Sequence, residues 1–158
     1  MTPEEMKRLH DEHLAAEERQ DIEAVMRTYS DDCYHEAVAI GLRFTGKAAI
    51  RFQYESFWTA FPDAAPTQVQ EAFGDNFLMD RGMFNATLLG PLYGLPATGK
   101  RVSLPFARTV LFQDGLIHAE IGYADFASLC DQAELPLTEA LAMARALAAS
   151  QRGAPVVP

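Results

Sequence analysis

The chain has 158 residues, of which 49% are hydrophobic and 22% are charged, a composition typical of one globular domain rather than a disordered segment. Its formal net charge of −9 argues against nucleic acid as a partner, because phosphate binding requires clustered Lys and Arg. No apolar run approaches the roughly 20 residues of a membrane span, so no membrane partner is expected.

Two further features bear on the cell compartment. The segment from Met1 to Arg8 lacks the apolar stretch that a signal peptide requires. Cys33 and Cys130 are the only cysteines, and neither forms part of a CxxC pair. Both features favour a reducing, cytoplasmic location.

Helices are predicted first along the chain. Thr2, followed by Pro3 and by Glu5 three residues after the cap, indicates a helix start, and this helix should run to about residue 19. Asp21 caps a second helix that reaches about residue 29. Gly46 opens a third, in which apolar and aromatic residues recur at helical spacing until Pro62: Ile50, Tyr54, Phe57 and Trp58.

Strands dominate the second half. A short strand at 33–38 precedes the third helix, and four longer strands with a period of two follow it: 67–73, 76–89, 100–112 and 116–124. Asp114-Gly115 is a strong hairpin signal. Two helical pieces, 126–133 and 136–150, and a frayed tail complete the chain.

This order predicts an α+β fold in which a curved antiparallel sheet wraps around the N-terminal helices and leaves an internal pocket. We expect one domain over residues 1–135. Residues 136–158 should form a C-terminal helix and tail, packed on the domain or on a partner subunit.

Familiar catalytic motifs are incomplete. The segments 41–47 and 94–100 approach the phosphate-binding loop but lack its final hydroxyl residue. His10 and His13 are three residues apart, a spacing that can bind metal, yet no third ligand can be placed. We therefore predict no metal site, with His10 exposed to solvent and His13 on the inner face of the first helix.

Alternation along the strands sorts side chains by face. If the faces that carry polar groups look inward, the pocket has apolar walls and encloses His35, Arg81, Arg108 and Glu120. The residues expected to share these inward faces are Cys33, Ala37, Phe77, Met79, Met83, Asn85, Leu104, Phe106, Val110, His118, Gly122 and Ala124.

Such a mixture suits chemistry on an apolar ligand. A neutral His35 can act as a base near neutral pH, and Arg108 can stabilise a developing enolate oxygen. Glu120 is either the base or the group that neutralises a buried arginine. The alternative is an inward salt bridge that supports a binding pocket without catalysis.

Five segments in register carry a family resemblance. They are Tyr29-Ser30-Asp31-Asp32, Phe44-Thr45-Gly46-Lys47-Ala48-Ala49-Ile50, Pro96-Ala97-Thr98-Gly99-Lys100-Arg101-Val102, Phe112-Gln113-Asp114-Gly115-Leu116-Ile117 and Asp125-Phe126-Ala127-Ser128-Leu129. The chain resembles the SnoaL-like polyketide cyclase branch of the nuclear-transport-factor-2-like superfamily, and is also similar to limonene epoxide hydrolases and ketosteroid isomerases. The resemblance implies a cone-shaped domain, a homodimer and no cofactor.

The resemblance also shows where this sequence departs from its relatives. It implies that the cyclase carboxylate falls at Gly122 and the cyclase histidine at Arg108. Ketosteroid isomerase positions fall at Arg108, His13 and Ala37. The epoxide hydrolase arginine matches Arg81, but its two aspartate positions are occupied by Met83 and Gly122.

We predict a cofactor-independent enzyme that removes a proton beside the carbonyl of an apolar compound, as in cyclisation, isomerisation or dehydration. The predicted catalytic residues are His35, Arg108 and Glu120. The alternative is a non-catalytic small-molecule-binding or dimerisation module. The predicted substrate-binding residues are His13, Trp58, Arg81, Met83, Leu104, Phe106 and Gly122.

Overall fold

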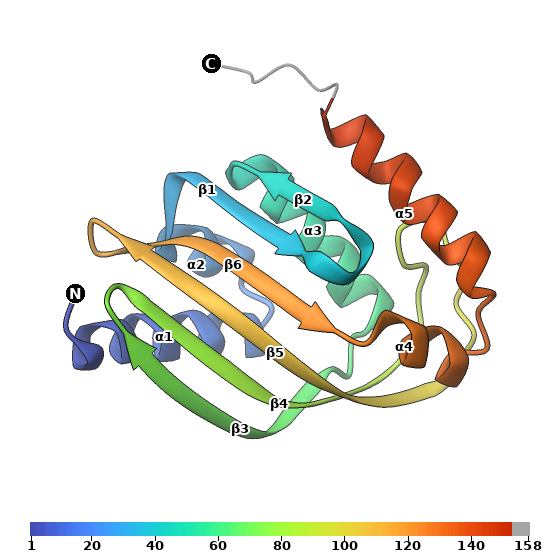
Figure 1. Ribbon diagram of the computed structural model, residues 1–158, viewed down its shortest axis with the longest axis horizontal. Helices are drawn as coiled ribbons and strands as arrows, with labels where there is room; N and C mark the ends of the chain where they lie inside the picture. The colour runs from blue at the N-terminus through green and yellow to red at the C-terminus, as the bar shows by residue number, and fades with distance from the viewer. Residues whose placement is uncertain (153–158) are drawn as a thin grey trace.

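The computed structural model describes residues 1–152, with helices packed against one curved, six-stranded sheet (Figure 1). The predicted tail, 153–158, lies outside the described residues. The elements in chain order are α1 (Pro3–Glu18), α2 (Ile22–Thr28), β1 (Tyr29–Ala37), the 3-10 turn η1 (Val38–Ile40), β2 (Leu42–Thr45), α3 (Lys47–Ala60), β3 (Ala65–Gly74), β4 (Phe77–Thr87), β5 (Arg101–Gln113), β6 (Leu116–Ala124), α4 (Phe126–Gln132) and α5 (Leu137–Arg152).

Helix α1 begins at the predicted cap. The Thr2 hydroxyl accepts the Glu5 backbone N–H at 3.2 Å, and the Glu5 carboxylate accepts the Thr2 backbone N–H at 2.8 Å, which completes a capping box. The buried face of this helix carries polar residues as well as apolar ones: Met6, His10, His13 and Ala16. The expectation of a solvent-exposed His10 is therefore wrong, because i, i+3 and i+4 spacing turns both histidines toward the sheet.

The sheet has the strand order β2-β1-β6-β5-β4-β3. Every neighbouring pair is antiparallel except β1–β6, which is parallel, so the sheet is mixed rather than wholly antiparallel as predicted. The α+β fold class is confirmed. The periodicity of a strand does not encode the direction of a partner that lies far away in the sequence, and the short strand β2 was not predicted at all.

A register shift between β5 and β6 matters for the site. It falls between Leu111 and Phe112, so alternation along β6 is interrupted and both Ile117 and Glu120 are buried. His118 was expected on the same face as Glu120, and this expectation is wrong, because the shift turns His118 to the other face. Its Nδ1 instead lies 3.4 Å from Oδ1 of the exposed Asp32.

Helices α1 to α3 lie together on one face of the sheet, behind it in Figure 1. They cover an apolar core that includes Leu42, Ile50, Leu78, Val110 and Ile117. Helix α5 contacts β2 and η1 of its own domain, while the boundary predicted at residue 135 stays a prediction. Across residues 1–152, no helix has the length and apolar character needed to cross a membrane.

Candidate active site

Arg108 and Glu120 meet on the inner face of the sheet. They lie on the neighbouring strands β5 and β6, and Arg108 Nη1 donates to Glu120 Oε1 at 3.0 Å. Glu120 has no exposed surface, whereas the Arg108 side chain is 15% exposed. The sequence-based expectation that these two side chains face one shared interior agrees with this geometry.

Helices α1 and α3 and strand β1 supply further partners for the Glu120 carboxylate. The Tyr29 hydroxyl donates to its Oε2, and the Tyr54 hydroxyl oxygen lies 2.9 Å from the same atom, within hydrogen-bond distance. His13 Nε2 lies 3.6 Å from its Oε1. Glu120 is thus a buried carboxylate surrounded by hydrogen-bond donors, the environment in which an ionised carboxylate is retained.

Arg108 is held from its other side by Asp80 on β4. Its Nη2 donates to Asp80 Oδ2 at 2.7 Å and its Nε to Oδ1 at 3.3 Å, which is a bidentate pair. Nη2 also lies 3.1 Å from His10 Nε2, which accepts its hydrogen bond. Asp80 is almost completely buried, so this arginine joins two buried carboxylates, Asp80 and Glu120.

The hydrogen bonds of His13 indicate that both of its ring nitrogens carry protons. The Thr28 hydroxyl donates its hydrogen to the Val25 carbonyl oxygen at 2.7 Å. It can therefore only accept a hydrogen bond from His13 Nδ1, which lies 2.8 Å away. His13 Nε2 lies 2.9 Å from a Glu17 carboxylate oxygen, which also accepts. Both bonds form only in the imidazolium.

The pKa of His13 agrees with that assignment. Burial opposes the charged ring, but the carboxylates of Glu120 and Glu17 outweigh it and raise the pKa of His13 to about 9. For Glu120, burial is again outweighed, here by Arg108 and His13, and its pKa lies well below the ordinary value. The centre therefore carries paired charges near neutral pH.

His35 differs from the other members of the cluster. Burial lowers its pKa despite the nearby Glu120, so its ring is neutral near pH 7. Its Nε2 lies 4.0 Å from Glu120 Oε2, and its Nδ1 has no hydrogen-bond partner within residues 1–152. The side chain is 17% exposed. His35 is thus a neutral imidazole with a buried, unpartnered Nδ1 beside a carboxylate.

Two predicted substrate-binding residues on β4 lie elsewhere. Arg81 is exposed on the opposite face of the sheet, where its guanidinium donates to Gln70 Oε1 at 2.7 and 3.0 Å, and Met83 shares that face. The expectation was wrong by one residue of register, since Asp80 and Leu78 face inward. Both sets of alternate residues along β4 contain apolar residues and one charged residue, so the sequence pattern did not show which set faces inward.

The remaining predicted residues surround the centre at different distances along the strands. Trp58 packs its ring against Tyr54, with 5.3 Å between centroids. Gly122 pairs with Arg108 across the β5–β6 ladder. Leu104 and Phe106 precede Arg108 at alternate positions of β5; Leu104 is buried in a second apolar cluster, and Phe106 is partly exposed.

Several members of the cluster were missed from the sequence. Glu17 stands four residues after His13 on α1, a spacing that places the two side chains together. Tyr29 was assigned to a helix end, and Tyr54 to an apolar helix face. Asp80 alternates with Leu78 and Gly82, a pattern that could have indicated an inner face.

One group in the cluster resembles a metal site in its spacing. The donor atoms of His13, Glu17 and Glu120 all lie within 4.8 Å of one another. A metal ion there would have to displace the His13 proton and compete with Arg108 for Glu120. The carboxylates of Glu17 and Glu120 are already neutralised by the imidazolium of His13 and the guanidinium of Arg108.

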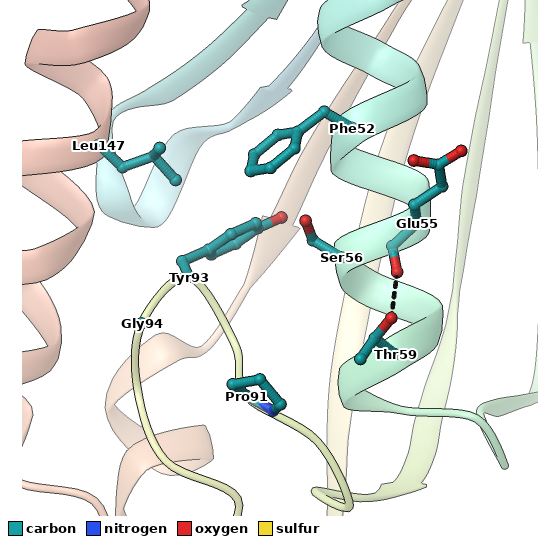
Figure 2. Close-up of a pocket in the computed structure, with 8 residues that line it drawn as sticks. All are labelled: Phe52, Glu55, Ser56, Thr59, Pro91, Tyr93, Gly94 and Leu147. Atoms are coloured by element: carbon teal, nitrogen blue, oxygen red, sulfur yellow. Dashed lines mark hydrogen bonds between the residues drawn. The ribbon is translucent and has the colours of Figure 1, made fainter.

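Within residues 1–152, hollows also lie outside the cluster. One, of about 430 Å³, is an open hollow lined by α3, the 90–95 loop and α5, with Phe52, Tyr93 and Leu147 facing it (Figure 2). Another, of about 500 Å³, lies beside Arg81, Phe106 and Tyr123. The first is an apolar cleft with hydroxyl and carboxylate groups at its α3 side.

The curved sheet, the helices on one face and the polar centre between them define a nuclear-transport-factor-2-like α+β domain. A family model described as SnoaL-like polyketide cyclase matches residues 5–133. The chain belongs to this family. Among curated proteins, no match is found.

Solved structures of the same fold share little sequence with this chain. A proposed polyketide cyclase from Xanthomonas campestris pv. campestris is 18% identical with a TM-score of 0.74, covering 82% of this chain and 97% of its own. AclR from Streptomyces galilaeus, a proposed hydroxylase, is 24% identical with a TM-score of 0.70, covering 85% and 100%. A protein with a ketosteroid isomerase-like fold from Catenulispora acidiphila, solved with trimethylamine, is 17% identical with a TM-score of 0.70, covering 87% of this chain and 98% of its own. This likeness establishes the fold.

Proposed function

We propose that this protein is a cofactor-independent enzyme that removes a proton beside the carbonyl group of an apolar small molecule. The supporting observation is the free Nδ1 of His35, on a neutral ring next to Glu120 and Arg108. Cyclisation, isomerisation and dehydration all begin with this step. Membership of the SnoaL-like family is consistent with it.

His35 is the better base of the two that the sequence suggested. Glu120 already accepts hydrogen bonds from Tyr29 and Arg108, lies within hydrogen-bond distance of the Tyr54 hydroxyl, and has a strongly lowered pKa, so it does not retain a further proton. A neutral imidazole can accept a proton at pH 7. The Glu120 carboxylate 4.0 Å away then stabilises the imidazolium that forms.

Arg108 is suited to the developing oxyanion. A guanidinium has five N–H groups, and four of them are engaged here by Asp80, His10 and Glu120. The remaining N–H, on Nη1, can donate to an enolate oxygen. The partial exposure of this side chain gives a carbonyl access to it.

The substrate would lie along the inner face of β5 and β6. Trp58 and Phe106 offer aromatic surface there, and Gly122 leaves room, since a Cβ added to it would meet only the Glu36 carbonyl oxygen at 3.6 Å. We retain these residues, with His13, Leu104 and the catalytic set, as the proposed site. Arg81 and Met83 are no longer part of it.

Exchange of hydrogen for deuterium tests proton abstraction without knowledge of the product. 1-Tetralone, an apolar ketone, is incubated with the protein in D₂O, and loss of the hydrogens beside its carbonyl is followed by NMR. His35→Ala should lower the exchange rate by at least about 100-fold. His118→Ala, on the same sheet but outside the cluster, is the matched control. Equal rates for wild type and His35→Ala would refute the base assignment.

A second candidate function is ligand binding without turnover. It is favoured by the complete burial of Glu120 and by the apolar cleft beside α3, which is separate from the polar centre. A thermal-shift panel of apolar ligands, followed by mass analysis of the recovered ligands, separates the two functions. Ligands that stabilise the fold and return unchanged, together with no ketone exchange, would favour binding alone.

We also propose a homodimer in the cytoplasm. Exposed apolar side chains on the sheet face opposite the helices, such as Met79 and Tyr123, provide surface for a second copy. Light scattering on the purified protein gives the mass directly. Substituting Tyr123 with Asp should shift a dimer toward monomer.

A further inference from the structure

A continuous chain of hydrogen bonds joins the buried Glu120 to the surface of the molecule. Tyr54 lies at its middle: its hydroxyl oxygen is 2.9 Å from Glu120 Oε2 on the inner side and 2.5 Å from Glu17 Oε1 on the outer side. Glu17 is 22% exposed, whereas Glu120 has no exposed surface. The Tyr54 hydroxyl therefore bridges an interior carboxylate and one that reaches solvent.

The Tyr54 hydroxyl has one hydrogen and two carboxylate acceptors. It can donate to Glu17 or to Glu120 at a given moment, but not to both. Rotation about its C–O bond therefore exchanges two states of similar geometry. In either state its oxygen keeps lone pairs with which to accept a proton from the opposite side, which is the requirement for a relay.

We propose that Tyr54 and Glu17 form a proton relay that connects the Glu120 centre with water. This inference deepens the proposed function, on which it rests, by giving the proton taken by His35 a route out of the interior. After Nδ1 of His35 has bonded the substrate proton, the Nε2–H bond breaks and that proton passes to Glu120 when the 4.0 Å gap between Nε2 and Oε2 closes; Glu120 holds it only briefly, because its pKa is strongly lowered. The O–H bond of the protonated Glu120 then breaks as a new O–H bond forms on Tyr54. The original Tyr54 O–H bond breaks as its proton passes to Glu17, which releases it to water.

His13 supports this route without being a member of it. Its Nε2 lies 2.9 Å from Glu17 Oε1 and 3.1 Å from the Tyr54 oxygen, and Nδ1 is anchored by Thr28. The imidazolium holds Glu17 next to Tyr54 and favours its ionised form. A proton that arrives at Glu17 is therefore released rather than retained.

The Tyr29 hydroxyl allows a test that needs no substrate. It donates to Glu120 and lies 3.2 Å from the Tyr54 oxygen, on the interior side of the relay. With Cζ of Tyr29 labelled with ¹³C, a mixture of equal parts H₂O and D₂O gives one averaged Cζ resonance if the hydroxyl exchanges fast. It gives two resonances, for OH and OD, if exchange is slow.

We expect one averaged resonance for the wild-type protein and two for Tyr54→Phe and Glu17→Gln. Tyr123→Phe, on the opposite face of the sheet, should keep the single resonance and is the matched control. If Tyr54→Phe fails to fold, Glu17→Gln, at the partly exposed end, still tests the route. Two resonances in the wild type, or a single one in either relay variant, would overturn the relay. Ketone exchange by His35 is measured separately, so failure of the relay and failure of the proposed base are distinguishable.

Discussion

Arg108 and Glu120 form a buried ion pair, 3.0 Å between Nη1 and Oε1, on neighbouring strands of the inner sheet face. Neither charge would be stable there alone, because removal of an ion from water costs several kcal/mol. Asp80 and His13 complete the charge balance around them. The stability of the fold and the electrostatics of the proposed site therefore depend on the same side chains.

Arg81 and Arg108 were both expected in the pocket from the sequence, but their replacement should lower the free energy of unfolding by unequal amounts. Arg108→Ala leaves Asp80 and Glu120 buried without their cation, and we expect a loss of about 3–5 kcal/mol in the free energy of unfolding. Arg81→Ala removes an exposed contact to Gln70 and should cost less than about 1 kcal/mol. Urea denaturation of both variants measures the difference. Similar losses would contradict the strand register.

The free energy of unfolding should fall at alkaline pH, because His13 loses its proton there. Its pKa is raised from 6.5 to about 9 in the fold, so its contribution is complete below pH 6.5 and is lost as pH rises through 9. The expected loss of unfolding free energy across this window is at most about 3 kcal/mol. Denaturation curves at several pH values should show the slope in the wild type and in His118→Gln, but not in His13→Gln.

Stability should also fall on the acidic side, for different reasons. The pKa of Glu120 is held well below its ordinary value against the effect of burial, chiefly by Arg108, so this contribution is present above 4.5 and lost as pH falls through the folded pKa. Burial lowers the pKa of His35, which adds a loss as pH falls below 6.5. A stability maximum near neutral pH follows, and a maximum at pH 9 or above would contradict these charge assignments.

The glycine at the family's carboxylate position should accept a side chain. Gly122→Asp has space, since its Cβ would meet only a carbonyl oxygen at 3.6 Å, and it would face Arg108 across the ladder. We expect a folded protein whose unfolding free energy changes by about 1 kcal/mol or less. In Gly82→Asp the Cβ would meet the Thr67 carbonyl oxygen at 2.7 Å, and the cost should reach about 1–3 kcal/mol. The melting temperatures of the two variants measure this difference. Equal melting temperatures would contradict the space for a side chain at Gly122.

The packing of helix α5 on its own domain should depend on the small residues along its buried face. Ala144 is 4% exposed, at the contact of this helix with the domain, and Ala144→Glu would bury a charge without a partner at a cost of about 2 kcal/mol or more. Ala146 is exposed on the same helix, so Ala146→Glu should have almost no effect. Chemical denaturation gives both values. An unaffected Ala144→Glu would place the helix away from its own domain.

Much of this site was predictable from alternation and spacing. The β5 pattern was sufficient to turn Arg108 inward. The Asp114-Gly115 turn alone would pair Arg108 with Ile121 and leave Glu120 on the other face, whereas the register shift near Leu111 pairs Arg108 with Gly122 and brings Glu120 beside it. The prediction for Arg81 was wrong because β4 offers two alternations with similar apolar content. The exposure expected for His10 was wrong because a buried histidine is satisfied by partners far away in the sequence, here Arg108 and Glu71.

The sequence by itself determined the α+β class, most of the helices and strands in their order, and the inward direction of His35 and Arg108, because these depend on local periodicity. The inward direction of Glu120 depends on the register shift between β5 and β6. Only the tertiary structure decided which charges neutralise one another. The parallel pairing of β1 with β6 brings His35 next to Glu120, and the packing of α1 and α3 adds His13 and Tyr54. Protonation states follow from these long-range contacts, since a pKa responds to distance in space rather than to position in the chain.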